Sequence, residues 1–584
     1  MMLQALIAYA ERENLGDPDF ETVGVRWLIS ITADGRLAGE PIPLAENPEE
    51  KKPRPKEMVR PFTSPNELNQ GTKSHFLCDT LERVVLFLDP KAADKAEARL
   101  VQHQYFRTLL GEAAAGVPSE SGRLVAAQQV LADPAAMASL REWFAAARAK
   151  PSDNVTLAVD GCILLQSEAV RQYWRNRRHG RASSSREPRV CLATGRLMET
   201  LDTTEKIRGV PGGLAMGTNL ISFDKDSFCS FGLEQAQNAA LSAGAELKVR
   251  SGLNALIQKG RTQGLVFNDT VHLHWTRDLI VHDPMDLLAS ADPEAIAALL
   301  QSVQTGRRQV GLEVNEYYAL SLSGNGARIV VRNWLESTVS EVEQNVARWF
   351  SDLAIIHPDG LGIRRDFKFG ALLYGMVRAE LAELPPQIPT QLLHAALRGP
   401  NVPLPQSALA AALNRQRIDP ENRLNAARVA LIKACLLRSQ TNSNPQLQSH
   451  CVMTEAINPE STNAAYLCGR LFAVFDRLQY LALGGVNAGV VERYYASASV
   501  TPSLVMGRLF RNAQFHLAKA GGGLAENVRK DFEEITASLG RRFPTTLDLE
   551  GQGRFALGYY HQKAEYRRRT AERREHLASE PAEA

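Results

Sequence analysis

The sequence predicts an α+β protein of several domains, in which a mixed N-terminal region with antiparallel hairpins precedes an all-α C-terminal helical bundle. Two observations lead to this prediction. The chain has 584 residues, too many for one hydrophobic core. Alternating apolar residues and Gly-containing turns dominate before residue 380, and helical spacing dominates after it. We therefore expect a mixed region at 1–380, a bundle at 381–578 and a disordered tail at 579–584.

Three hairpins are predicted in the mixed region. Each has residues that alternate between apolar and polar side chains, followed by a turn whose glycine accepts a positive φ. In the first hairpin the strand 25–32 precedes a turn at 34–35, and in the second the strand 155–159 precedes a turn at 160–161. In the third, the turn at 323–326 joins the strands 317–322 and 327–334.

Helix signals follow the third hairpin and continue to the end of the chain. Thr338 and Glu341 fit a capping box, which satisfies two free N–H groups at a helix start. An apolar stripe then recurs at helical spacing, formed by Val342, Val346, Trp349, Phe350 and Leu353. Because proline is tolerated in a first turn, four prolines predict later helix starts, namely Pro389, Pro405, Pro420 and Pro502. Composition predicts linkers at 46–65 and 175–188.

Composition excludes several classes of protein. The formal net charge is only +2, so any nucleic-acid binding must depend on local patches. The seven cysteines form no Cys-x-x-Cys pair, which predicts reduced thiols rather than a zinc module or disulfides. No basic leader or long apolar run is present, and we expect a cytoplasmic protein without membrane contact. No Gly-Lys dipeptide occurs, which argues against a Walker-type NTPase, and we expect no cofactor.

A small histidine group is the one candidate for a metal site. His272 and His274 share one face of a strand-like segment, and His282-Asp283 follows closely. Two histidines on one face are able to bind a metal ion. The alternative, an exposed polar face near Trp275, is favoured because two-ligand coincidences are common.

A glycine-rich loop spans residues 209–217. A nucleotide-binding loop would open a helix, but residues 219–223 read as a strand, so a nucleotide cradle is rejected. The loop is then either a plain surface turn or a backbone stretch that approaches another surface closely, including a DNA groove.

The densest basic run covers residues 171–181 and is followed by Arg186 and Arg189. Arginine binds phosphate through two parallel hydrogen bonds, and Tyr173 and Trp174 offer rings for stacking on bases. Nucleic-acid binding is therefore favoured over a solvated loop. Smaller patches lie at 51–60 and 364–368, whereas the arginines at 567–574 are mixed with glutamates and read as a solvated helix.

Several segments resemble one protein family, the large subunit of the type I-C CRISPR surveillance complex, Cascade. Their order and spacing carry the resemblance, which extends almost to the end of the chain. The segments are 2–9, 73–79, 207–210, 220–223, 231–232, 323–328, 331–334, 465–473, 493–498 and 555–560. The chain departs from the family in its glycine loop, where Pro211, Leu214 and Met216 replace the serine and glutamine that are frequent there.

The resemblance implies a non-catalytic subunit that recognises the motif flanking a DNA target, aids duplex opening and R-loop formation, and helps recruit a separate helicase-nuclease. In such complexes base pairing reads the target sequence, whereas protein reads the flanking motif and the backbone. The implied partners are the crRNA-containing subunits that bind the handle and form the backbone, a small subunit, and double-stranded target DNA.

We assign candidate DNA contacts within this framework. The flanking motif is assigned to Asn66, Asn69, Gln70, Lys73, Gly212 and Gly213, because amides read base edges and glycines permit close approach. The DNA backbone is assigned to Lys56, Arg60, Arg175, Arg177, Arg178 and Arg181. The displaced strand is assigned to Arg508, Arg511, Lys519, Arg541 and Arg542. No catalytic residue or metal ligand is assigned.

Other readings remain open. A metal-dependent nuclease would use the histidine group, and a structural scaffold would leave the basic runs solvated. The family resemblance also implies that a small subunit is encoded inside the gene of the large subunit. Of the late methionines Met376, Met453 and Met506, we expect Met453 to be the internal start, because it lies in a polar stretch before a helix, and the product is then 453–584.

Overall fold

The structure is a computed structural model that describes residues 2–15, 17, 19–45, 54–63, 65–68, 71–89, 95–181, 188–305, 313–443, 453–521, 523–540 and 543–579. It confirms the α+β class, because small sheets occupy the N-terminal part and only helices follow residue 364 among the described residues. Contacts divide the chain into unit 1, Met1–Ile207 with Asn219–Asn254, and unit 2, Arg208–Thr218 with Ala255–Ala584. The boundary predicted at residue 380 stays a prediction.

Unit 1 is built around a five-stranded sheet with the order β3-β2-β6-β5 and with β7 on β6. The strands are β2 (Trp27–Ile31), β3 (Ile42–Pro43), β5 (Cys78–Thr80), β6 (Asn154–Val159) and β7 (Cys162–Ile163). The parallel pair of β2 and β6 joins segments more than a hundred residues apart, which local alternation does not reveal. Gly35 and Gly161 have φ of 75° and 74°, as their predicted turns require.

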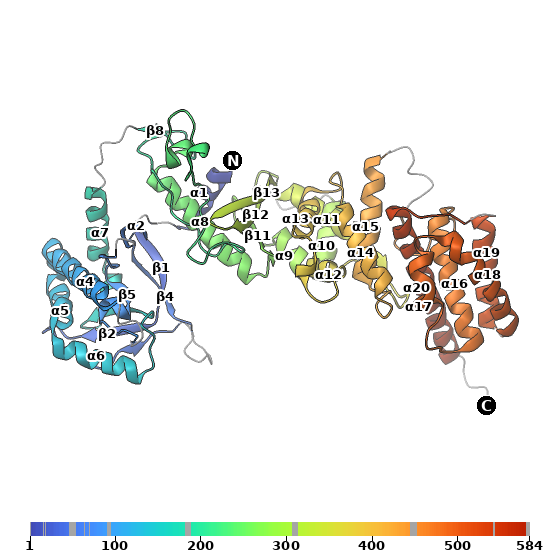
Figure 1. Cartoon of the computed structure of the whole chain (residues 1–584), viewed down its shortest axis with the longest axis horizontal. Helices are drawn as coiled ribbons and strands as arrows, with labels where there is room; N and C mark the ends of the chain where they lie inside the picture. The colour runs from blue at the N-terminus through green and yellow to red at the C-terminus, as the bar shows by residue number, and fades with distance from the viewer. Residues whose placement is uncertain are drawn as a thin grey trace. The chain divides into compact units, whose positions relative to one another are not determined.

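Helices enclose this sheet in a continuous apolar core. They are α4 (Ala96–Gly116), α5 (Ser121–Ala132), α6 (Pro134–Ala146) and α7 (Glu168–Arg181), seen in blue to teal in Figure 1. Asp133 begins α6 by accepting the N–H groups of Ala135 and Ala136, and Pro134 occupies the first turn, where its missing N–H costs nothing. Trp174 of α7 enters the core and stacks on Phe76 with ring centroids 5.2 Å apart.

The remaining part of unit 1 contains α1 (Met2–Arg12), the short hairpin of β8 (Arg189–Val190) and β9 (Leu197–Met198), and the start of α8 (Ala243–Thr262). Leu3 and Ile7 of α1 pack on a small cluster that includes Cys191 and Leu241. A second strand pair, β1 (Phe20–Val25) with β4 (Lys56–Pro61), also lies in this unit.

Unit 2 begins with a four-stranded antiparallel sheet in the order β10-β11-β12-β13. Its strands are β10 (Val266–Phe267), β11 (Thr270–Thr276), β12 (Glu316–Asn325) and β13 (Arg328–Thr338). The third predicted hairpin is therefore confirmed, but both of its strands are longer than alternation indicated. The turn is reduced to Gly326 and Ala327, because Asn325 already pairs with Arg328.

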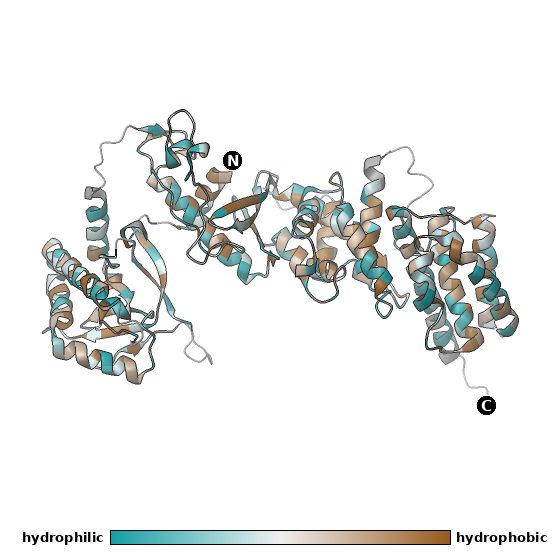
Figure 2. Ribbon diagram, in the orientation of Figure 1, coloured by the Kyte–Doolittle hydropathy of each residue, from teal (hydrophilic) through white to brown (hydrophobic). Residues whose placement is uncertain are grey.

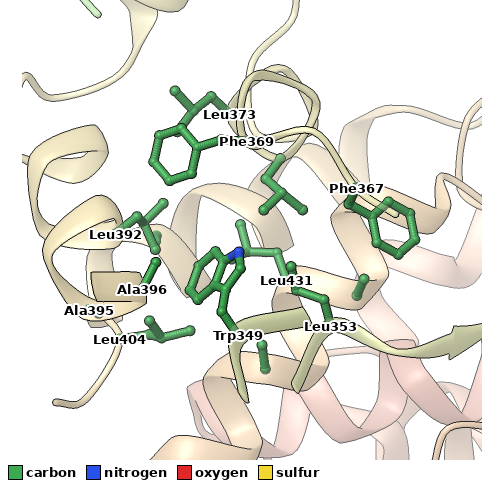
Figure 3. Packing of buried hydrophobic residues seen from close by; sticks show 14 of the residues in the cluster. Trp349, Leu353, Phe367, Phe369, Leu373, Leu392, Ala395, Ala396, Leu404 and Leu431 are labelled. Carbon is green, nitrogen blue, oxygen red and sulfur yellow. The ribbon is translucent and has the colours of Figure 1, made fainter. Parts of the chain in front are cut away.

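The sheet leads into α11 (Val339–Leu353), whose start and apolar stripe were both predicted. The Thr338 hydroxyl accepts the N–H of Glu341 at 3.2 Å, which confirms the N-cap, while the Glu341 carboxylate accepts the Ser337 hydroxyl. Trp349 lies fully buried among side chains from several helices of this core (Figure 3). Those helices are α9 (Pro284–Ser290), α10 (Pro293–Thr305), α12 (Phe369–Tyr374), α13 (Gln387–Arg398), α14 (Gln406–Ile418) and α15 (Ala426–Ser443).

The last five helices form a second core within unit 2. They are α16 (Ala464–Leu483), α17 (Val490–Ala498), α18 (Pro502–Lys519), α19 (Gly523–Leu539) and α20 (Leu549–Ser579). Figure 2 shows apolar and polar residues interspersed along these helices, as amphipathic packing requires. α20 also contributes Ala556, Leu557 and Tyr560 to the core around Trp349.

Four local expectations were wrong. Residues 219–223, which read as a strand in the sequence, belong to no strand. The segment 46–65, predicted as a linker, contains strand β4. In the second predicted linker, 175–188, residues 175–181 are the last part of helix α7, which Val170 and Trp174 anchor in the core. Pro420 does not begin a helix, because Asp419 ends α14 and bonds Arg428 instead. Residues 46–53, 182–187 and 580–584 lie outside the described residues. No helix in the described ranges is both long and apolar enough to cross a membrane.

Candidate nucleic-acid interface

The glycine loop is seated on the β12–β13 hairpin of unit 2. The Gly324 N–H donates to the Pro211 carbonyl at 2.7 Å, and Gly213 forms an isolated parallel bridge with Gly326. A Cβ atom at Gly324 would overlap the backbone of Gly212 and Gly213. Two backbones therefore touch here without side chains between them.

Gly212 and Gly213 are required by this seat. Gly212 has a φ of 71°, and its Cβ would lie 3.1 Å from both the Gly324 carbonyl and Asp269. A Cβ on Gly213 would lie 2.5 Å from the Thr218 methyl group. The contact with the hairpin therefore requires glycine at both positions, independently of any contact with DNA.

The outward side chains of the loop are apolar. Leu214 is 50% exposed and Met216 is 74% exposed. Because the backbone behind them is fixed by the hairpin, these two side chains project from a supported tip. Both residues depart from the family pattern, and no contact was predicted for either of them from the sequence.

The other segment assigned to the flanking motif belongs to unit 1. Asn66 lies in the short helix α2 (Pro65–Leu68), and its side chain, like Asn69 and Gln70, lies outside the described residues. Lys73 donates to Glu67 at 2.9 Å. This ion pair neutralises part of the charge that was assigned to a phosphate.

Arg60, assigned to the DNA backbone, is a buried structural residue. It bonds Glu21 at 2.8 and 3.0 Å and the Cys78 carbonyl at 3.3 Å. Burial raises the pKa of the neighbouring Cys78 thiol to about 12, so this thiol stays protonated. Lys56, on the same strand, is exposed.

The arginines of α7 pair with acids from distant parts of unit 1. Arg175 bonds Asp17 at 2.9 Å and also Glu168. Arg177 pairs with Glu112. Asp17 and Glu112 lie near these arginines in space and far from them in sequence, so the basic run itself does not reveal them.

Arg178 is held equally firmly. It pairs with Asp19 at 2.9 Å and donates to the Phe62 carbonyl at 2.7 Å. Its guanidinium lies 5.1 Å from the Phe62 ring centre, and that of Arg250 lies 5.0 Å from it. The side chain of Arg181 lies outside the described residues.

The cations assigned to the displaced strand differ from those of α7. Arg508, Arg511 and Lys519 are exposed on α18, and none forms an ion pair with any residue that the structure describes. Arg541 and Arg542 lie outside the described residues.

His272 and His274 are buried, which corrects the expectation of an exposed polar face, whereas His282 is exposed. His272 and His274 are 1% and 2% exposed, because α8 covers one face of the sheet and the Trp349 core covers the other. His272 Nδ1 lies 2.8 Å from the Ser321 hydroxyl, and burial lowers its pKa to about 4.

His274 is tied to the start of α9. Its Nδ1 lies 2.8 Å from Asp283, whose other oxygen accepts the Met285 N–H at 2.9 Å. Burial is the largest single influence on Asp283 and opposes its charged carboxylate, but His274, the Met285 N–H and Lys259 together outweigh burial and lower the pKa of Asp283. Among the residues that the structure describes, no three His, Cys, Asp or Glu side chains are grouped to hold a metal ion.

Comparison with known families identifies the class. A family model described as CRISPR-associated protein (Cas_Csd1) matches residues 6–567. This match covers nearly the whole chain, so the protein belongs to the Cas_Csd1 family of CRISPR-associated proteins. No curated protein matches it.

Proposed function

We propose that this chain is the non-catalytic large subunit of a type I-C crRNA-guided surveillance complex. It recognises the flanking motif of double-stranded target DNA, aids duplex opening and R-loop formation, and helps recruit a helicase-nuclease. It works in the cytoplasm beside the crRNA-containing subunits and a small subunit. Membership of the Cas_Csd1 family supports this class of function.

One observation carries the DNA-inspecting role. The loop at 208–218 holds two exposed apolar side chains, Leu214 and Met216, on a backbone clamped to the β12–β13 hairpin. Apolar side chains that enter between base steps unstack them and kink the duplex. A supported apolar tip is therefore suited to begin opening a duplex beside its flanking motif.

The test replaces the tip and leaves its seat intact. In the complete complex, Leu214→Ser with Met216→Ser should keep crRNA and all subunits but weaken capture of a duplex with the correct flank. Unstacking costs a few kcal/mol per step, so a loss of about ten-fold or more is expected. Leu279→Ser, at another exposed leucine of unit 2, is the matched control.

A target with unpaired bases beside the flank separates opening from assembly. It should restore capture by the double variant, because the work of unstacking is already done. Equal capture of paired targets by the variant and the parent would remove the loop tip from this role. Metal-dependent cleavage of DNA by the isolated chain would contradict the non-catalytic assignment.

Glycine and α7 variants are less informative. Any side chain at Gly212 or Gly213 disturbs the hairpin seat, and losing Arg175, Arg177 or Arg178 leaves an acid unpaired in unit 1. Such variants are expected to lower stability as well as affinity for DNA. A lower salt dependence at unchanged stability would instead identify direct phosphate contacts.

A further inference from the structure

The solvent side of α18 carries a regular stripe of side chains. At spacings of three and four residues, which places them on one face of a helix, it presents Leu504, Arg508, Arg511, Phe515 and Lys519. Leu504 is 78% exposed and Phe515 is 75% exposed. The opposite side packs into the bundle core through Val505, Met506, Leu509 and Ala513.

The charge of this stripe is uncompensated. α18 contains no Asp or Glu, and its three cations make no ion pair within the described part of the chain. Helices α19 and α20 differ in carrying acids beside their cations: Arg529 of α19 pairs with Glu526, and Arg568 of α20 pairs with Glu565 and Glu572. The cations of α18 are therefore available to a polyanion.

The apolar members of the stripe favour one kind of polyanion. A duplex hides the faces of its bases, whereas a single strand offers them for stacking on an aromatic ring. Leu504 and Phe515 lie eleven residues apart, about 16 Å along the helix, with two arginines between them. They form no continuous apolar patch of the sort that the core of a protein interface requires.

We propose that this stripe binds single-stranded nucleic acid, with Phe515 stacking on a base and Arg508, Arg511 and Lys519 contacting phosphates. The stripe is about 22 Å long, so it contacts only a short stretch of the strand. The identity of the strand rests on the proposed function, in which it is the strand displaced from the target. Phe515 and Leu504 are additions to the cations assigned from sequence.

The experiment measures binding of a fluorescent single-stranded oligodeoxynucleotide to the full chain over a series of salt concentrations. Phe515→Ala should weaken binding about five-fold to a hundred-fold, as expected for one stacked base, without changing the salt slope. Arg508→Gln with Arg511→Gln should reduce the slope of log affinity against log salt by about 0.7 per lost contact. Phe231→Ala, at a fully exposed phenylalanine of unit 1, is the matched control.

Two further variants decide between base stacking and an apolar contact. Phe515→Trp should restore binding, whereas Phe515→Leu should not, because leucine has no ring to stack. The proposal would be overturned if either Phe515→Leu or Phe515→Ala bound the oligonucleotide as tightly as the parent chain. Parent-like binding by Phe515→Leu would indicate a protein partner for this face. An equal loss on duplex DNA would also contradict it.

This outcome is separable from that of the proposed function. If Phe515→Ala leaves single-strand binding unchanged while the complex still discriminates flanks, only the stripe is wrong. If binding falls while the complex ignores the flank, the stripe stands and the flank-reading role is wrong.

Discussion

Buried cations of α15 in unit 2 donate hydrogen bonds to carbonyls at the ends of other helices. Three cations of α15 each reach a carbonyl near the C-terminus of a different helix. Arg428 donates to Gly375 at 2.6 Å after α12, and Lys433 donates to Asp352 at 2.8 Å in α11. Arg438 donates to Ala395 in α13 and Gly399 just beyond it. Carbonyls near a helix end are short of partners within their own helix, so they favour a cation nearby. Arg428 also pairs with Asp419, and Arg438 with Asp352, which compensates the burial of their charges.

A second buried group joins α16 to α20. The Tyr466 hydroxyl accepts the Asn458 N–H at 3.1 Å and lies within hydrogen-bond distance of His561 Nδ1, 3.0 Å away. Burial lowers the pKa of His561 to about 3, so the ring is neutral in the folded chain.

We predict that His561 makes the bundle sensitive to acid. In the unfolded chain histidine takes up a proton near pH 6.5, whereas in the folded chain it does so only near pH 3. The contribution of His561 to the free energy of unfolding is therefore complete above about pH 6.5 and decreases as the pH falls from about 6.5 to about 3. At about pH 5 the loss is about 2 kcal/mol. Urea unfolding of the parent and of His561→Gln should show a shallower acid loss in the variant; parallel curves would contradict the assignment.

At the scale of elements, α16 and α20 cross at two glycines. A Cβ on Gly469 would overlap the Phe555 carbonyl, and a Cβ on Gly558 would overlap the Tyr466 carbonyl. Each glycine thus lets the backbone of one helix touch the other. The helices contribute to both cores of unit 2, so this crossing supports the junction between the cores.

We predict that a single methyl group at this crossing is destabilising. Gly469→Ala or Gly558→Ala must force the helices apart, and overpacking of this kind costs about 1–3 kcal/mol. Gly507→Ala, in α18 with open space around it, is the control and should stabilise by about 0.5–1 kcal/mol. Thermal unfolding measures both changes; a neutral Gly469→Ala would show that the crossing is loose.

At the scale of the whole molecule, residues 453–579 contain five helices with a core of their own. Met453 packs on the edge of the Trp349 core, and the Ile356 N–H donates to the Glu455 backbone carbonyl at 2.7 Å. Residues 444–452, immediately before Met453, lie outside the described residues. A chain that began at Met453 would keep every helix of the bundle.

We predict that the gene also yields this bundle as a separate small subunit beginning at Met453. Such a product lacks the Trp349 core, which would expose the apolar side chains of Ala556, Leu557 and Tyr560. We therefore expect to find it bound within the complex rather than free. Intact-mass measurement of the complex purified from the native gene should reveal a chain starting at Met453. Changing that codon should remove this chain; an unchanged composition would rule out the start site.

The sequence predicted those features whose signals are local. The turns at Gly35 and Gly161, the Thr338 cap and the apolar stripe of α11 all depend on residues within a few positions of one another. The family resemblance likewise followed from short segments in a fixed order, and comparison confirmed CRISPR association over residues 6–567.

Only the tertiary structure decided which of these residues are available to a partner. The arginines of α7 looked free in sequence, but Asp17, Asp19 and Glu112 neutralise them across the fold. The cations of α18 looked no different, yet helix packing leaves them exposed beside Phe515. The reason is physical: helical and strand periodicity is set by neighbours along the chain, whereas burial and ion pairing depend on which distant segments meet.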